Sequence, residues 1–274
     1  MEDKRFDPYQ FIGFFLIALI LTWMLYRNDS PQELSKNEVS NIISESKENQ
    51  KFVLNNVKDS VSSVNYDRVY GVYGLWLQDK KGKIQVLENQ NLLLEIDPKG
   101  GGLRKVWLKN FKNYLDEPLH LIYEENNYFN IKFLTIDGRT FNTKDFYFTS
   151  ELISRDGSQI LSLKSEISKR EYIEFIYSIN PKTYLIDFKI KSEGISPLLD
   201  SKNSPVIEIK NRSFRNSKSI DYENRYTELT YGYEEDKVDY LSAAGDDEET
   251  ENEVRWISFR QHFFSTILIP KTKI

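Results

Sequence analysis

The sequence predicts one transmembrane helix followed by a large antiparallel two-sheet β-sandwich, a mainly β fold. Three observations carry this prediction. Residues 8–26 are apolar and uncharged, and residues 28–65 are strongly polar. From about residue 66 onward, short runs alternate apolar and polar side chains, and Gly, Pro and Asp interrupt them. We therefore expect a membrane anchor at 1–27, a polar tether at 28–65 and a folded domain at 66–274.

The uncharged stretch Pro8–Tyr26 has the length of a membrane-spanning helix. A helix of this length rises about 28 Å, close to the ~30 Å hydrocarbon core of a bilayer. Lys4 and Arg5 precede it, as in a secretory signal peptide, but residues 25–29 offer no small-residue cleavage site. We predict an uncleaved anchor, and the basic residues on its two sides are too evenly balanced to orient it. The predicted anchor residues are Phe11, Phe14, Leu16, Leu19, Leu21 and Trp23.

The polar stretch Asn28–Asn65 is rich in Ser, Asn, Lys and Glu. It carries no apolar stripe long enough to bury a helix face. As a flexible coil it would span about 30–37 Å end to end. We expect it to tether the folded domain to the anchor.

The sequence of the folded domain predicts many short strands. In Leu92–Ile96 and Tyr184–Ile190 every second residue is apolar, and similar runs occur at 130–136, 160–166, 171–178, 205–210 and 227–233. Turn-forming dipeptides such as Asp137-Gly138 separate the runs. About fifteen candidate strands favour a large two-sheet sandwich over a small immunoglobulin-like domain.

Composition narrows the possible functions. The chain is 39% hydrophobic and 29% charged, which is typical of a globular protein. It has no cysteine, which excludes a disulfide framework and thiolate metal sites. The net charge of −5 is local, because residues 234–253 hold ten acidic side chains against Lys237 alone, and the rest of the chain carries +4. No basic stripe supports nucleic-acid binding.

Residues with catalytic chemistry are sparse. His120 and His262 are the only histidines, and both have apolar neighbours. Gly100-Gly101-Gly102 lacks the Lys-Ser/Thr of a phosphate-binding loop, so it indicates a turn or a β-bulge that allows positive φ. We predict no catalytic, cofactor-binding or metal site. The alternative is a sugar-converting sandwich enzyme, which would need a histidine together with an acid such as Glu174.

Three segments carry a resemblance. The first is Tyr70–Gly74 leading to residues 86–94, the second is residues 96–108, and the third is the aromatic block Trp256–Pro270. They occur in the order and approximate spacing typical of one protein family. They resemble the YidC/Oxa family of membrane protein insertases, in its anchor and periplasmic domain. The matching signature residues are Leu87, Glu88, Asn89, Gly100, Gly101, Trp256, Gln261, His262, Phe263 and Phe264.

This resemblance implies a galactose-mutarotase-like β-supersandwich, a cytoplasmic N-terminus and a place in the bacterial inner membrane, with residues from about 28 onward in the periplasm. It implies no enzymatic activity and no cofactor. The implied partners are the lipid bilayer, nascent membrane proteins and Sec translocon subunits. The insertase core of the family follows this domain, so we expect the chain to be the N-terminal part of a longer protein. The rival interpretations are an anchored carbohydrate-active enzyme and a stand-alone envelope adaptor.

The aromatic block also yields a packing prediction. Trp256, Phe259, Phe263 and Phe264 lie within nine residues, beside Ile257, Ile267, Leu268 and Ile269. This density favours burial in the last strands of the sandwich. The alternative is an exposed surface that contacts a partner.

Overall fold

The structure is a computed structural model that describes residues 66–123 and 125–272. The predicted anchor at 8–26 and the predicted tether at 28–65 lie outside these residues. None of the helices in the described part of the chain combines the length and the apolarity that crossing a bilayer requires.

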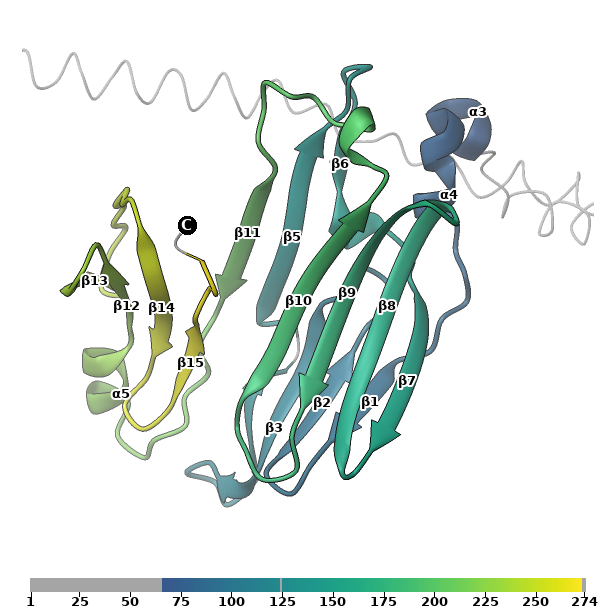
Figure 1. Cartoon of the computed structure of the whole chain (residues 1–274). Helices are drawn as coiled ribbons and strands as arrows, with labels where there is room; N and C mark the ends of the chain where they lie inside the picture. The colour runs from purple at the N-terminus through teal and green to yellow at the C-terminus, as the bar shows by residue number, and fades with distance from the viewer. Residues whose placement is uncertain (1–65, 124, 273–274) are drawn as a thin grey trace, which may run out of the picture. The chain divides into compact units, whose positions relative to one another are not determined.

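The described chain begins with three short helical segments, α3 (Tyr66–Tyr70), η1 (Gly71–Tyr73) and α4 (Gly74–Leu77). They lie next to one end of β8 (Figure 1). The indole of Trp76 in α4 is fully buried, and its ring centroid lies 4.7 Å from that of Phe146 and 5.6 Å from that of Phe141. The helices are therefore anchored to the β domain by an aromatic cluster.

Two four-stranded antiparallel sheets and one three-stranded sheet follow. The first sheet, in sequence order, holds β1 (Gln85–Glu88), β2 (Leu92–Ile96), β3 (Leu103–Lys112) and β4 (Pro118–Ile122). The second has the order β10-β9-β8-β7 and holds β7 (Thr149–Arg155), β8 (Ser158–Ser168), β9 (Glu171–Ile179) and β10 (Ile186–Glu193). The third has the order β11-β5-β6 and holds β5 (Asn127–Leu134), β6 (Thr140–Asn142) and β11 (Val206–Asn211). Short 3₁₀ turns lie at Thr143–Asp145 and Ser196–Leu198.

A fourth sheet is formed by the C-terminal part. Helix α5 (Ile220–Tyr226) leads into it, and its strand order is β13-β12-β14-β15. The strands are β12 (Glu228–Tyr233), β13 (Lys237–Ser242), β14 (Val254–Arg260) and β15 (Ser265–Leu268). All strand pairs in the described residues are antiparallel.

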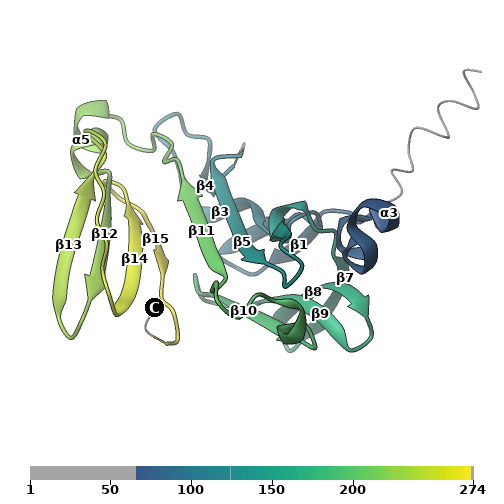
Figure 2. The ribbon, with the colours of Figure 1, turned by 90° about the horizontal axis from the view of Figure 1, so that it is seen from above.

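The first two sheets form two layers around one hydrophobic core (Figure 2). The alternating apolar side chains of β2 and β9 are buried on their inner faces, as the period-two pattern predicts. The hydroxyl of Tyr177 donates a hydrogen bond to the carbonyl oxygen of Gly101, at 2.8 Å, and so joins the layers. From the third sheet, Phe129 packs edge-on against Phe175 and Phe188 of the second. The predicted mainly β, antiparallel class is confirmed, and the layers are consistent with a sandwich.

The glycine turn between β2 and β3 has the conformation that the sequence predicts. Gly100 and Gly101 have φ angles of +80° and +69°. A Cβ atom at Gly101 would lie 2.5 Å from Cδ2 of Phe175. The turn therefore needs glycine both for its backbone and for the close approach of the two layers.

Candidate functional site: the C-terminal sheet

One face of the C-terminal sheet carries exposed apolar side chains, and we call it the open face. The strand register pairs Gly232 with Val238 and with Trp256, and cross-strand partners lie on the same face. By the same rule, Tyr240 and Ile267 share this face, since Thr230 pairs with Tyr240 and Ser258, and Ser258 pairs with Ile267. The apolar side chains of this face that are more than half exposed are Val238, Tyr240 and Ile267.

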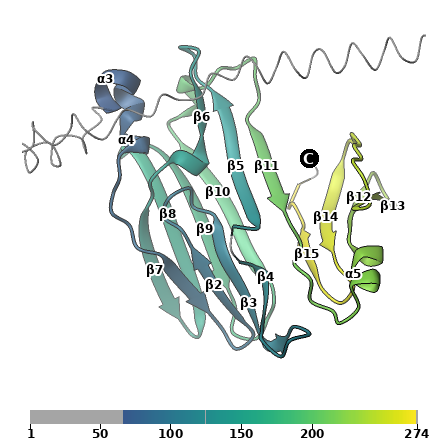
Figure 3. The same ribbon diagram turned by 180° about the vertical axis from the view of Figure 1, so that it is seen from behind.

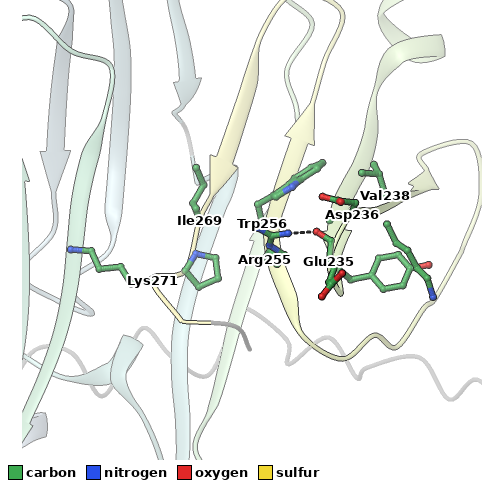
Figure 4. A pocket seen from close by; sticks show the side chains of 11 residues that line it. Glu235, Asp236, Val238, Arg255, Trp256, Ile269 and Lys271 are labelled. Atoms are coloured by element: carbon green, nitrogen blue, oxygen red, sulfur yellow. Dashed lines mark hydrogen bonds between the residues drawn. The ribbon is translucent and has the colours of Figure 1, made fainter.

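A pocket of about 590 Å³ lies at one end of this sheet, lined by residues of the β12–β13 turn, β14 and the segment after β15 (Figure 4). The indole of Trp256 lies over Gly232, where a Cβ atom would come within 2.3 Å of its Nε1. The guanidinium of Arg255 donates a hydrogen bond to the carbonyl oxygen of Glu235. Lys237 forms an ion pair with Glu234 at 2.9 Å. The pocket thus combines apolar walls with walls that carry both positive and negative side chains.

The side chain of Gln261, the residue after β14, is held by hydrogen bonds to α5 and to the loop before it. Its amide nitrogen donates hydrogen bonds to the carbonyl oxygen of Phe214 and to the carboxylate of Glu223, and its amide oxygen accepts one from Asn216. The Glu223 carboxylate also accepts hydrogen bonds from the backbone N–H groups of Asn216 and Ser217, at 3.2 and 2.5 Å. All four polar side chains, those of Gln261, Glu223, Asn216 and Ser217, are buried. This network fixes α5 and the preceding loop to the sheet.

The three residues after Gln261 have different environments. His262 stacks on the rings of Tyr222 and Tyr226, with centroids 5.7 and 5.0 Å away. Phe264 packs edge-on against Phe111 at 5.3 Å and contacts the sandwich core. Phe263, by contrast, is 68% exposed.

The predicted burial of the whole aromatic block is therefore wrong for Phe263, Ile267 and Ile269. Phe263 lies in the turn between β14 and β15, and this turn directs its ring outward. The turn is closed by a hydrogen bond that the N–H of Gln261 donates to the carbonyl oxygen of Phe264, at 2.8 Å. Ile267 lies on β15, the end strand of its sheet, and Ile269 follows it with 70% exposure. Trp256 and Phe259 are half-buried.

The N-terminal signature residues lie in the sandwich. Leu87 is fully buried in the core. The Asn89 side chain accepts hydrogen bonds from the N–H groups of Asn91 and Leu92, at 2.8 and 2.7 Å, and donates to the carbonyl oxygens of Asn180 and Thr183, at 2.6 and 2.9 Å. It therefore joins the β1–β2 turn to the segment before β10. The neighbouring Glu88 forms an ion pair with Lys109 at 3.0 Å.

The residues that a sugar-converting enzyme would use are not brought together. His120 stacks on Tyr123 at 4.9 Å, and burial, followed by the charge of Lys105, lowers its pKa. Glu174 accepts a hydrogen bond from Ser162 at 2.7 Å and lies 3.6 Å from Lys191. Within the described residues, 66–123 and 125–272, no hydrogen bond joins Glu174 to either histidine. In the same residues no cluster of His, Asp and Glu could hold a metal ion.

The sequence gives no direct indication of the network around Glu223. The one local signal is Ser219, whose hydroxyl caps α5 by accepting a hydrogen bond from the N–H of Tyr222. A capping serine predicts where a helix starts but not which acidic side chain of that helix is buried.

The family model of the YidC periplasmic domain matches residues 84–274. The chain is 31% identical over 270 residues to the membrane protein insertase YidC of Azobacteroides pseudotrichonymphae, an alignment that covers 96% of this chain and 42% of that protein. It is 36% identical over 201 residues to the YidC insertase of Bacteroides fragilis, covering 72% and 32% of the two chains. It is 28% identical over 283 residues to the YidC insertase of Parabacteroides distasonis, an alignment that covers 97% of this chain and 44% of that protein. The chain thus spans less than half the length of these relatives, and no solved structure matches it.

Proposed function

Since the chain belongs to the family of the YidC periplasmic domain, we propose that it is the N-terminal part of a membrane protein insertase. The observation that carries this proposal is the match over residues 84–274, preceded by an uncharged stretch long enough to span a bilayer at 8–26. Three relatives that the chain matches over at least 72% of its length bear the name membrane protein insertase.

In this proposal the described domain is a support and not the part that inserts membrane proteins. An insertase lowers the free-energy cost of moving polar groups through lipid by offering a polar path, which needs membrane-spanning helices. The part of the protein after Ile274 would supply that path. The domain plan is an anchor at 1–27, a tether at 28–65 and a periplasmic domain from 66, and no step requires an enzyme or a cofactor.

The proposed location is the bacterial inner membrane, with a cytoplasmic N-terminus and residues from about 28 onward in the periplasm. The proposed partners are the lipid bilayer, nascent membrane proteins and Sec translocon subunits. We assign the signature residues a structural role. The hydrogen bonds of Asn89 and Gln261 and the burial of Leu87 support that assignment.

The test is complementation. The full-length gene is expressed in bacteria depleted of their own insertase, and the insertion of a reporter membrane protein is measured. We expect the full-length protein to restore insertion and a version that ends at Ile274 to fail. A stop codon directly after Ile274 in the natural gene, or a full-length protein that expresses well and restores nothing, would refute the proposal.

Topology is tested separately. A phosphatase that is active only outside the cytoplasm is fused after Pro270, and a reporter that is active only in the cytoplasm is fused at the same place in a second strain. We expect activity from the first fusion alone. Activity from the second alone would place the domain on the cytoplasmic side.

A further inference from the structure

Strand β11 is the end strand of its sheet. It pairs with β5 on one side, from Val206 opposite Lys132 to Asn211 opposite Asn127. On its other side no strand of the described residues pairs with it. Such an edge presents free N–H and C=O groups, which can template the pairing of a further strand.

The hydrophobic core is open along this edge. Ile207 pairs with Ile131 and Ile209 with Phe129, so both isoleucines share the face on which Ile131 and Phe129 contact the core. Nevertheless Ile207 is 51% exposed and Ile209 is 37% exposed. The end strand of the second sheet, β10, shows the same feature, because Ile190 is opposite the buried Phe175 but is itself exposed.

A second free edge lies beside the first. Strand β15 ends the C-terminal sheet and pairs only with β14 among the described strands. In Figures 1 and 3 β15 is the neighbour of β11, and the described chain ends close by. Ile267 on β15 and Ile269 just after this strand are exposed as well. The border between β11 and β15 therefore offers backbone groups and apolar surface on both sides.

We propose that the polypeptide directly following Ile274 in the longer protein forms a β-strand that pairs with the free side of β11 and covers Ile207 and Ile209. This inference rests on the proposed function, under which the protein continues past Ile274. More than half of each relative's length lies outside the matched region. The added strand needs an extended backbone, an apolar side chain at every second position, and no proline at the paired positions.

A strand from the same chain is the favoured occupant for a physical reason. The described chain ends near this border, so the next segment reaches it as an intramolecular partner. Short tethers give effective concentrations in the millimolar range, about a thousandfold above micromolar free protein. A second copy or a client segment would have to displace it.

Photo-cross-linking tests this inference. Residues 1–274 contain no cysteine, so one can be introduced at a chosen site after any later cysteines are replaced by serine. A benzophenone maleimide is attached to Ile207→Cys in the full-length protein. The matched control is Ile153→Cys on β7, which is also an end strand and whose side chain is also 51% exposed. We expect a cross-link within one polypeptide to a peptide after residue 274 from position 207, and none to that region from position 153.

Amide hydrogen exchange of the unsubstituted full-length protein provides an independent measurement. The free-side N–H groups of β11 should exchange about tenfold more slowly than those of β7, because only they are paired. Equal exchange at both edges, or cross-links from position 207 that lead only to a second copy or to another protein, would overturn the inference. The insertion assay is separate: restored insertion without protection of β11 rejects this inference alone, and protection without insertion rejects the proposed function alone.

Discussion

Replacing Gly101 by alanine should destabilise the sandwich more than the same replacement at another positive-φ glycine. The new Cβ atom would lie 2.5 Å from Cδ2 and 3.0 Å from Cε2 of Phe175. Phe175 is fully buried and stacks on Phe148 at 4.9 Å, so it has little room to retreat. The substitution therefore adds overpacking to backbone strain.

The magnitude follows from three contributions. The left-handed backbone costs alanine about 1–2 kcal/mol, and overpacking a core costs about 1–3 kcal/mol. The lower entropy of the unfolded alanine chain returns about 0.4–1 kcal/mol. We expect Gly101→Ala to lower the free energy of unfolding by about 2–4 kcal/mol, a large part of the ~5–15 kcal/mol of a typical domain.

Gly138→Ala is the matched control. Gly138 has a φ of +78°, close to that of Gly101, but no atom lies within 4 Å of its added Cβ. The free energy of unfolding of this variant should fall by about 0–1.5 kcal/mol, from the backbone alone. Urea unfolding of the chain from residue 66 onward, followed by tryptophan fluorescence, measures both values. Equal losses in the two variants would refute the argument that the glycine turn is set by the packing of the layers.

Three further predictions concern the C-terminal sheet and His120. Glu223→Ala should lower the free energy of unfolding by about 2–4 kcal/mol in thermal melts, because it leaves buried N–H groups without an acceptor. Glu248→Ala, in the exposed acidic loop, is the control and should leave the free energy of unfolding unchanged. Equal melting curves for the two variants would contradict the network. Phe264→Ala should lower the free energy of unfolding by about 2 kcal/mol, less than the loss of a fully buried aromatic side chain. Phe263→Ala should lower it little, because the ring of Phe263 is mostly exposed. The reverse order in urea unfolding would contradict the burial described for these two rings. Burial lowers the pKa of His120 in the folded state, so its contribution to stability is full above the unfolded pKa of about 6.5 and is lost as the pH falls through the folded value. His120→Gln should therefore flatten the pH dependence of the urea midpoint below neutrality, and an unchanged pH profile would show that His120 is not its source.

The strands of the sandwich could be predicted from the sequence because their signal is local. The two-residue period of Leu92–Ile96 and of 171–178 appears as β2 and β9, with the predicted side chains buried. The positive φ of Gly100 and Gly101 could also be predicted, since no other residue type adopts it as readily. These features depend only on neighbours in the chain.

Burial at the C-terminal end could not be predicted in the same way. Aromatic density around Phe263 indicates burial, but whether a ring is covered depends on a turn and on which strand ends the sheet. Glu223 has the character of a surface residue of a short helix, and it is buried because Gln261, 38 positions later, contacts it. Contacts between distant segments decide both outcomes.

The aromatic cluster around Trp76 has a mechanical consequence. The described chain enters the domain through α3 and α4, where the carbonyl oxygen of Trp76 accepts a hydrogen bond from Tyr147 and that of Val69 accepts one from Arg139. A pulling force applied at the N-terminal end of the described chain therefore acts first on α3 and α4, whose buried Trp76 indole packs against Phe141 and Phe146. The force does not act first on a β-strand of the domain. The domain should resist traction from its N-terminal side until this cluster is extracted as a unit.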